Sequence, residues 1–499
     1  MTFGFGHSQP VDLLIVGGGV NGAGIARDAA GRGLSVILIE QDDLASHTSS
    51  ASSKLIHGGL RYLEYAEFRL VHEALSERER LLGIAPHIIW PLEFVLPHAP
   101  YLRPAWVIRA GLFLYDHLGR RRRLPASRGL SFAGHPVGRV LGPQYSRGFS
   151  YADCWVEDSR LVALNAADAA RHGAIIRTRT KLLRARPQEG FWHAETGRGE
   201  IAARALVNAA GPWVAEILSA RLGRPVEKGV RLIQGSHIIV RRLHQGEYAF
   251  ILQNPDGRVV FVIPFEQHFS LIGTTDTPFS GDPGHIAIST EETLYLCDSV
   301  NRYFRSPISP DDVVWSYAGV RPLFDDHAKD AKAITRDYVL DLEQGDGMPP
   351  LLSVYGGKIT TYRKLAEHAL AKLLPALGRP VGSSWTAAEP LPGGDFVDFD
   401  AYLADFRARH HALDAKTARR LVRAYGTRAE VIAKGDMGED LGGGLSEAEV
   451  DYLVREEFAM EAEDILWRRS KLGLHVRHET ALRLARQLAR GELAHSGQP

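Results

Sequence analysis

The chain has 499 residues, more than one ordinary domain contains, so two or three domains with sizeable hydrophobic cores are expected. Its 59 Lys and Arg residues equal its 59 Asp and Glu residues, which excludes a global electrostatic field that would recruit nucleic acid. Cys154 and Cys297 are far apart and form neither a C-x-x-C motif nor a disulfide framework, so a reducing compartment is expected.

The amino-terminal segment 1–10 has no basic start followed by a long apolar core, so we expect no secretory signal. No stretch approaches the ~20 apolar residues that a membrane-spanning helix requires. Any contact with a bilayer is therefore expected to be peripheral.

The first predicted unit is a βαβ motif. An apolar, β-branched run over 11–16 indicates a buried parallel strand, and a helix is expected over 23–30. A second strand over 35–39 ends at Glu40. An acid at the end of the second strand is typical of dinucleotide-binding folds, where the carboxylate binds the ribose hydroxyls.

A glycine loop connects the first strand to the helix, and Gly17, Gly19 and Gly22 occupy the three positions of G-x-G-x-x-G, with Asn21 between them. The first glycine permits the tight turn, the second lets a pyrophosphate approach the backbone, and the third allows close packing of helix on strand. Glu40 follows Gly22 by 18 residues, close to the ~20 typical of this motif. A bound dinucleotide is therefore predicted, with its phosphates at the helix amino terminus.

A hydroxyl-rich segment over 46–62 carries Lys54, His57 and Arg61 and ends beside a predicted helix over 68–82. A disordered linker is one interpretation of such a composition. Because the segment lies between an apolar strand and a helix, we favour a loop along the cofactor, where hydroxyls and amides donate to phosphate and flavin atoms.

The glycine loop, T-S-S-A-S-S-K-L-I-H-G-G-L-R-Y-L-E at 48–64 and Y-G-G-K-I-T-T-Y-R-K at 355–364 resemble the corresponding motifs of the bacterial aerobic, FAD-dependent glycerol-3-phosphate dehydrogenase family. This family belongs to the D-amino-acid-oxidase-like flavoproteins, and the resemblance spans nearly the whole chain. It implies bound FAD, oxidation of sn-glycerol 3-phosphate to dihydroxyacetone phosphate and transfer of electrons to a membrane quinone. It also implies a peripheral location at the cytoplasmic face of the inner membrane, and it leaves a homodimer open. Residue spacing by itself predicts only the dinucleotide site.

The segment 102–123 is apolar and aromatic and ends in four adjacent arginines, Arg120 to Arg123. Two interpretations fit it equally well: a core helix followed by a solvated charge run, or an interfacial membrane anchor. Both interpretations remain open, and this segment is our best candidate for membrane contact.

In the middle of the chain, a helix is expected over 159–172 and strands over 174–178 and 203–210. The second of these strands runs through Asn208 into Gly211 and a helix. This arrangement either places backbone against the cofactor or is an ordinary strand-to-helix turn.

A separate antiparallel sheet is predicted next, because strand-like runs alternate with turn residues over 233–240, 248–253, 259–265 and 269–276. A helix over 290–304 follows, and the run 313–322 leads back to the cofactor domain. A further strand over 351–355 and a helix over 361–374 repeat the strand, glycine and helix order of the start, and we expect their amides to face the flavin ring.

Pro390 to Asp395 is a predicted linker. Beyond it, helices are expected over 399–411, 415–425, 446–472 and 480–493. The acids at 456, 457, 461 and 463 are interpreted as a solvated face, as are Arg468 and Arg469. This tail is predicted to be a helical cap or docking module without catalytic residues.

The predicted fold class is α/β, with a Rossmann-like FAD-binding domain, an antiparallel β-sheet substrate domain and a carboxy-terminal α-helical domain. We assign 11–70, 150–228 and 318–390 to the first, 71–149 and 229–317 to the second and 395–499 to the third. The predicted cofactor-binding residues are Gly17, Gly19, Asn21, Gly22, Glu40, Thr48, Ser49, Ser50, Ser52, Lys54, Gly58, Gly59, Asn208, Gly211, Asp276, Gly357, Lys358, Ile359 and Thr360. No metal-ligand spacing stands out.

Oxidation of a secondary alcohol needs a base, and His237 is the first candidate, because imidazole titrates in the useful range and the family's matching histidine lies in the active site. His57 is the second candidate. The resemblance also places Arg321, Lys358, Arg61 and Tyr62 in the active site. We expect Arg321 near the reacting oxygens and the other three around the phosphate.

Three alternatives stay open. An oxidase of the same fold would pass electrons to oxygen and release peroxide. An amine or amino-acid oxidase would need a carboxylate-binding arginine without a phosphate cluster. A non-catalytic FAD-binding or RNA-modification scaffold is disfavoured by the neutral charge, and we expect no nucleic-acid partner.

Overall fold

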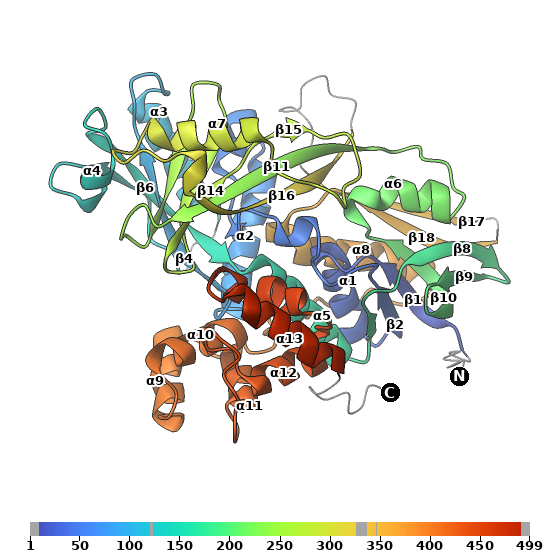
Figure 1. Ribbon diagram of the computed structural model, residues 1–499. Helices are drawn as coiled ribbons and strands as arrows, with labels where there is room; N and C mark the ends of the chain where they lie inside the picture. Colours follow the sequence, from blue (N-terminus) through green and yellow to red (C-terminus); the bar gives the residue numbers. More distant parts are fainter. Residues whose placement is uncertain (1–8, 120–122, 326–336, 346, 491–499) are drawn as a thin grey trace.

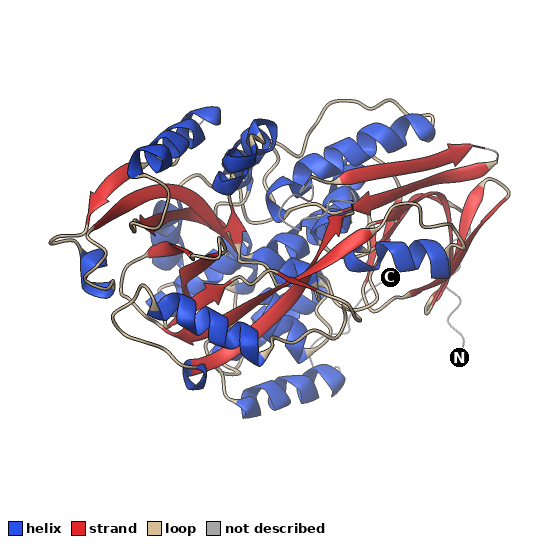
Figure 2. Ribbon diagram, turned by 90° about the horizontal axis from the view of Figure 1, so that it is seen from above, coloured by secondary structure: helices blue, strands red, loops and turns tan. Residues whose placement is uncertain are grey.

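The computed structural model describes residues 9–119, 123–325, 337–345 and 347–490. Two β-sheets lie side by side, and the carboxy-terminal helices, coloured orange to red, lie below them (Figure 1). The view from above shows the strands in two groups with helices packed on their outer sides (Figure 2). The α/β fold class predicted from the sequence is confirmed, with a Rossmann-like sheet, a second sheet and a helical domain.

The first sheet has the strand order β17-β18-β10-β1-β2-β7. Neighbouring strands from β18 to β7 run parallel, so that Ile15 of β1 lies between Leu38 of β2 and Val207 of β10. A β8–β9 hairpin joins β10. The bounds are β1 Val11–Val16, β2 Val36–Ile39, β7 Ile175–Arg177, β8 Leu182–Gln188, β9 Phe191–Thr196, β10 Gly199–Asn208, β17 Val339–Gly345 and β18 Met348–Tyr355.

Helices α1 (Val20–Gly31), α5 (Asp158–Arg171) and α8 (Tyr362–Ala376) cover one face of this sheet and share one hydrophobic core with it. The opposite face packs against β8, β9 and the short helix α6 (Val214–Glu216). The central strands β1 and β2 are buried along their whole length because both faces of the sheet are covered. The predicted βαβ unit is therefore confirmed.

The second sheet has the order β15-β11-β14-β13-β12-β4-β6-β3, with β16 paired to β11 and β5 to β6. Its neighbours are antiparallel as predicted, except that β4 and β12 run parallel. The bounds are β3 Leu55–Ile56, β4 Ile89–Pro97, β5 Arg128–Ser131, β6 Arg147–Val156, β11 Val230–Arg241, β12 Tyr248–Gln253, β13 Val259–Phe265, β14 Phe269–Gly273, β15 Thr277–Pro278 and β16 Val313–Phe324. Strands β3 and β6 come from segments that we assigned to the cofactor domain, and the domain boundaries stay a prediction.

Helices cover both faces of the second sheet as well. Helix α7 (Thr290–Asn301) packs on one face with α4 (Pro136–Val140) beside it, and α2 (Phe68–Ile84) and α3 (Ala105–Leu118) pack on the other. The predicted segment 102–123 is thus mostly helix α3, whereas Arg120 to Arg122 lie outside the described residues. In the described ranges, no helix combines the length and the apolar character needed to cross a membrane.

The carboxy-terminal domain contains α9 (Phe399–Arg409), α10 (Ala415–Tyr425), α11 (Ala429–Ile432), α12 (Glu447–Glu457) and α13 (His478–Arg490). The prediction of one helix over 446–472 is wrong. Helix α12 ends because Phe458 has a left-handed backbone conformation with φ of 60°. The Asp464 carboxylate accepts hydrogen bonds from the Met460 and Glu461 amides, and a π-helical turn follows over Asp464–Arg469.

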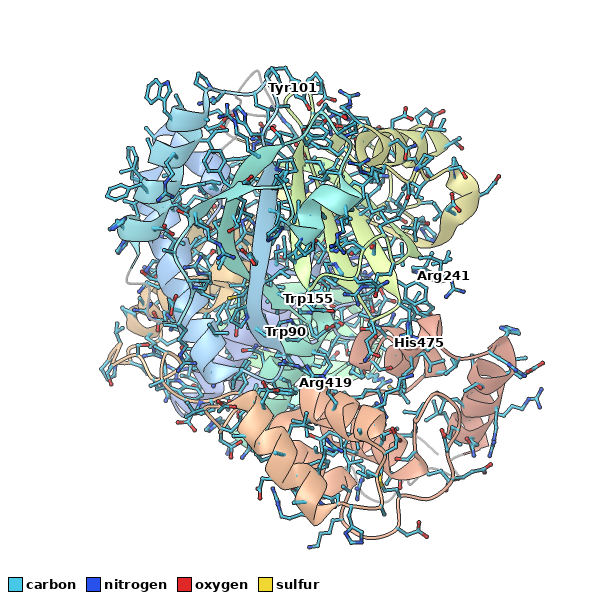
Figure 3. The ribbon with its side chains drawn as sticks, turned by 90° about the vertical axis from the view of Figure 1, so that its left-hand side faces the viewer. Trp90, Tyr101, Trp155, Arg241, Arg419 and His475 are labelled. Atoms are coloured by element: carbon cyan, nitrogen blue, oxygen red, sulfur yellow. The ribbon has the colours of Figure 1, made fainter. Side chains whose placement is uncertain are left out.

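The interpretation of the charges in this region as solvated is right for Glu456, Glu461 and Glu463, which are exposed, and wrong for the other three. Glu457 is fully buried and forms an ion pair with Arg160 of α5. Arg468 and Arg469 are buried and both donate to the Asp43 carboxylate on the loop after β2. These buried charges lie at the contact between the helical domain and the rest of the chain. Figure 3 shows the helical domain from one side, with Trp90 and Trp155 above Arg419.

Candidate active site

A cavity of about 480 Å³ is lined by residues of both sheets. The glycine loop, the 46–62 segment and the turn after β10 line one part, and β11, β16 and the 356–360 turn line another. The two glycine-bearing turns meet directly, because the Asn21 side-chain amide donates to the Gly356 carbonyl over 3.1 Å. One continuous site therefore extends from the first helix to the second sheet.

The backbone of the glycine loop excludes side chains at two of the predicted positions. Gly17 has φ of +115°, and a Cβ there would lie 2.5 Å from the Ala209 carbonyl oxygen. A Cβ at Gly22 would lie 1.9 Å from the Gly17 carbonyl oxygen. Only glycine fits these positions, which keeps the amino terminus of α1 open to an anionic ligand.

Glu40 lies at the end of β2 and lines the cavity. One carboxylate oxygen accepts from the Gly18 amide over 2.6 Å and the other from the Asp42 amide over 2.9 Å. Burial raises the pKa of Glu40, and the two amide hydrogen bonds oppose that shift. The carboxylate is thus held at the position where a ribose is bound in Rossmann folds.

These features fit a dinucleotide. The carbonyl oxygen of the Asn21 side chain is buried beside the cavity and, among the described residues, has no hydrogen-bond partner. The α1 amino terminus has no side-chain cap of its own, and the Val20 amide is bound by the Ser49 hydroxyl over 3.0 Å. Backbone and hydroxyl donors at a helix start are the groups that hold phosphate in this fold.

The 46–62 segment is an ordered loop, as favoured from the sequence. The Thr48 hydroxyl donates to the Val320 carbonyl of β16 over 2.6 Å. The Ser52 hydroxyl and the Lys54 ammonium both donate to Asp158, over 2.7 and 2.8 Å. Lys54 is almost completely buried, so its ion pair with Asp158 fixes the loop to the start of α5.

Most of the predicted site residues line this cavity. Five predicted cofactor-binding residues do not: Gly22, Ser50, Lys54, Gly58 and Asn208. They support its walls instead. Asn208, for example, is buried and donates to the Val214 carbonyl, which shapes the turn after β10. Those that do line the cavity are Gly17, Gly19, Asn21, Glu40, Thr48, Ser49, Ser52, His57, Gly59, Arg61, Tyr62, Gly211, His237, Asp276, Arg321, Gly357, Lys358, Ile359 and Thr360.

His237 lies on β11 at the cavity wall and is 2% exposed. Its Nε2 atom is 2.9 Å from the Ser53 hydroxyl, and its ring stacks on Tyr317 at 4.8 Å between centroids. Burial, with the charges of Lys54 and Arg321, lowers the pKa of His237 well below its usual range. The imidazole is therefore neutral at pH 7.

The three cationic side chains predicted for the active site line the same cavity. Arg321 donates to the Thr275 carbonyl over 2.9 Å and lies 3.2 Å from the Asp276 carboxylate. The Lys358 ammonium lies 4.1 Å from the centre of the Tyr62 ring, and Arg61 donates to the Gly257 carbonyl over 3.1 Å. His57, the second candidate base, accepts from the Gly59 amide through Nδ1 over 3.1 Å.

Sequence reasoning missed Ser53, Tyr317 and Arg258. Ser53 lay within the predicted loop, but its contact with His237 joins positions 184 residues apart. Arg258 lines the cavity and stacks on Tyr295 at 3.6 Å. An arginine next to Gly257 in a hairpin gives no sequence signal that separates it from an exposed turn residue.

The fold and the site together define a class: an oxidoreductase with a Rossmann-type dinucleotide site and a second sheet that closes the reaction cavity. Residues 12–363 match the family described as FAD dependent oxidoreductase. Residues 384–495 match the C-terminal domain of alpha-glycerophosphate oxidase.

The names of similar proteins are consistent with this class. The chain is 57% identical to a glycerol-3-phosphate dehydrogenase of Pseudomonas aeruginosa, over 96% of this chain and 95% of the relative. It is 51% identical to the aerobic glycerol-3-phosphate dehydrogenase of Escherichia coli, over 96% and 97%. It is also 49% identical to a D-erythritol 1-phosphate dehydrogenase of Brucella abortus, over 94% and 95%.

Among solved structures, the glycerol-3-phosphate dehydrogenase from Bacillus halodurans complexed with FAD has a TM-score of 0.73 at 25% identity, covering 99% of this chain and 97% of that chain. The chain belongs to the FAD dependent oxidoreductase family, within the group of aerobic glycerol-3-phosphate dehydrogenases that its motifs resemble. FAD is its cofactor.

Proposed function

We propose that this protein oxidises sn-glycerol 3-phosphate to dihydroxyacetone phosphate and transfers the electrons to a membrane quinone. The observation that carries the proposal is that a neutral, buried histidine and the cationic side chains Arg61, Arg321 and Lys358 line one cavity. Oxidation of a secondary alcohol needs a base such as the histidine, and binding of a phosphate dianion needs the cationic side chains.

The base has to act while hydride leaves the carbon, because an alcohol ionises no more readily than water, whose pKa is about 15.7. His237 meets the requirement, since its lowered pKa keeps the imidazole unprotonated at neutral pH. FAD, when bound, supplies the hydride acceptor.

Arg321 is suited to the reacting oxygen. Its guanidinium is held by the Thr275 carbonyl and by Asp276, so it presents a fixed cation to charge that develops during proton removal. Lys358 and Tyr62 contact each other, and Arg61 lines the same cavity, so the three side chains are suited to the phosphate.

The relatives leave one alternative substrate, because the Brucella abortus relative is named for D-erythritol 1-phosphate. Both compounds are phosphorylated polyols that the same cations would bind. We expect glycerol 3-phosphate to have the higher kcat/KM, with dihydroxyacetone phosphate as product. A higher kcat/KM for D-erythritol 1-phosphate would assign the site to the longer polyol, and activity with neither would contradict the proposal.

The identity of the electron acceptor can be tested with the same purified protein. We expect reduction of a water-soluble quinone analogue during turnover in air with little peroxide. Stoichiometric peroxide without quinone reduction would identify an oxidase instead.

The proposal includes contact of the protein with the cytoplasmic face of the inner membrane, where it would meet its quinone. Helix α3 supports it, because Trp106, Phe113 and Leu114 are 74%, 55% and 45% exposed on that helix. Exposed aromatic and apolar side chains beside arginines are typical of helices that lie in a bilayer interface.

A further inference from the structure

The two ring nitrogens of His237 have different surroundings. Nδ1 is buried and, in the described part of the chain, has no hydrogen-bond partner. Nε2 is 2.9 Å from the Ser53 hydroxyl. A base with one buried nitrogen and the other bound to a serine can exchange protons only through that serine or after the hydrogen bond breaks.

Ser53 itself lines the cavity and is half-buried, whereas His237 is almost completely buried. The neighbouring serine hydroxyls on the loop differ. Ser50 donates to the His47 carbonyl within the loop, and Ser52 donates to Asp158 at the start of α5. The Ser53 hydroxyl instead pairs with the imidazole, and both Ser53 and His237 line the cavity.

We propose that Ser53 is a catalytic residue that relays the substrate proton to His237; this inference rests on the function proposed above. As hydride leaves the carbon for the FAD that the site would hold, the substrate hydroxyl gives its proton to Ser53 Oγ, and Ser53 gives its own proton to His237 Nε2. One C–H bond and one O–H bond of the substrate break, the C=O double bond forms, and the imidazole ends protonated. The serine hydroxyl is regenerated, so it is not consumed.

The positions of both partners are fixed from two sides. The Tyr317 ring stacks on His237, and the Tyr317 hydroxyl donates to the Ser52 carbonyl over 2.8 Å. On the other side of Ser53, the Lys54 ammonium is bound by Asp158. A relay needs such a fixed donor–acceptor distance, and Tyr317 and Asp158 act here as positioning residues.

The test uses the FAD-loaded protein with sn-glycerol 3-phosphate under anaerobic conditions. Ser53→Ala should slow flavin reduction on the order of 10²-fold, the range of a lost acid–base group, with the FAD content and visible spectrum unchanged. Ser53→Thr keeps a hydroxyl and should retain most of the rate. Ser219→Ala, which removes an exposed hydroxyl bonded to its own helix, is the matched control and should match wild type.

A double substitution separates a relay from an independent substrate contact. Residues that act as one unit are not additive, so Ser53→Ala combined with His237→Gln should be no slower than His237→Gln alone. The solvent deuterium effect on reduction should indicate two transferred protons in wild type and one in the Ser53→Ala protein.

Several results would overturn the relay: Ser53→Ala reduced at the wild-type rate, multiplicative losses in the double variant, or loss of FAD on removal of the hydroxyl. A wild-type flavin that glycerol 3-phosphate does not reduce would instead contradict the proposed function, so the two failures are distinguishable.

Discussion

At the scale of single residues, burial sets the chemistry of His237. The side chain lies on a strand between a tyrosine ring and a serine, and the cations Lys54 and Arg321 are close enough to lower its pKa further. The same burial that removes it from water keeps it unprotonated. An exposed histidine could not serve as a base over as wide a pH range.

This lowered pKa predicts the pH dependence of flavin reduction. An ordinary histidine, with a pKa of 6.5, would lose its basic form as the pH falls through that value. Because the pKa of His237 lies below it, the limiting reduction rate at saturating substrate should stay nearly constant as the pH falls from about 8 to about 6. A rate that falls with a midpoint near 6.5 would contradict this assignment.

Arg321 provides the second prediction at this scale. Removing a fixed donor from developing negative charge costs on the order of 10²–10³-fold in rate, so Arg321→Ala should lower kcat/KM by about that factor. FAD content should be unchanged, since the variant leaves the glycine loop intact. Arg241→Ala is the matched control, because Arg241 is an exposed arginine on β11, the strand that pairs with β16, and it stacks on Phe269. Equal turnover by the Arg321 and Arg241 variants would place Arg321 outside the site.

At the scale of elements, the carboxy-terminal helices hold the cofactor loop. The Asp43 carboxylate lies three residues beyond Glu40 and receives hydrogen bonds from Arg468 over 2.6 Å and from Arg469 over 2.5 and 2.8 Å. All three residues are buried. The loop that begins at Glu40 is thus fixed by a domain whose described residues do not line the cavity.

Arg469→Met should therefore weaken FAD retention and lower stability. Breaking a buried ion pair leaves a carboxylate without full compensation and costs about 3–5 kcal/mol. Thermal unfolding followed by the release of flavin fluorescence would show an earlier transition. Arg455→Met is the control, because Arg455 is exposed on α12. Wild-type behaviour of the Arg469 variant would show that the contact does not stabilise the loop.

The elements also show what the sequence could and could not predict. The glycine turn, the buried strands and the hydroxyl-rich loop follow from local signals: apolar periodicity, backbone freedom of glycine and polar spacing. The break after α12 was missed, because Phe458 in a left-handed conformation gives no signal of its own in the sequence. Arg468 and Arg469 were misassigned to a solvated face, since their partner Asp43 is more than 400 residues away.

The site, like the fold, was predicted from the sequence only in part. Motif positions around the glycine turns identified most of the cavity lining, and His237, Arg321 and Lys358 were brought together as expected. The contact of Ser53 with His237 depends on β11 packing against a distant loop, which only tertiary structure determines. Long-range pairing of polar groups is the part of a site that local pattern does not encode.

At the scale of the whole molecule, two sheets share one cavity, a helical domain contacts the loop after β2, and α3 packs on one face of the second sheet. This arrangement places the exposed apolar side chains of α3 away from the first sheet and its cofactor loop. The proposed membrane contact is thereby separate from the cavity and can be tested separately.

Replacing Trp106 and Phe113 together by serine should lower binding to anionic lipid vesicles by at least about tenfold, because burying each such side chain contributes ~1.5–3 kcal/mol. Flavin reduction by substrate in solution should not change. Leu294→Ser is the control, since Leu294 is 45% exposed on α7. Vesicle binding that persists in the double variant, or a loss shared by the control, would place the membrane contact elsewhere.

The central claim is tested most directly by anaerobic titration of the purified, FAD-loaded protein with sn-glycerol 3-phosphate. We predict that the visible flavin absorption is bleached in proportion to the substrate added, and that one dihydroxyacetone phosphate is formed for each flavin reduced. A flavin spectrum that stays unchanged through an excess of substrate would contradict the account.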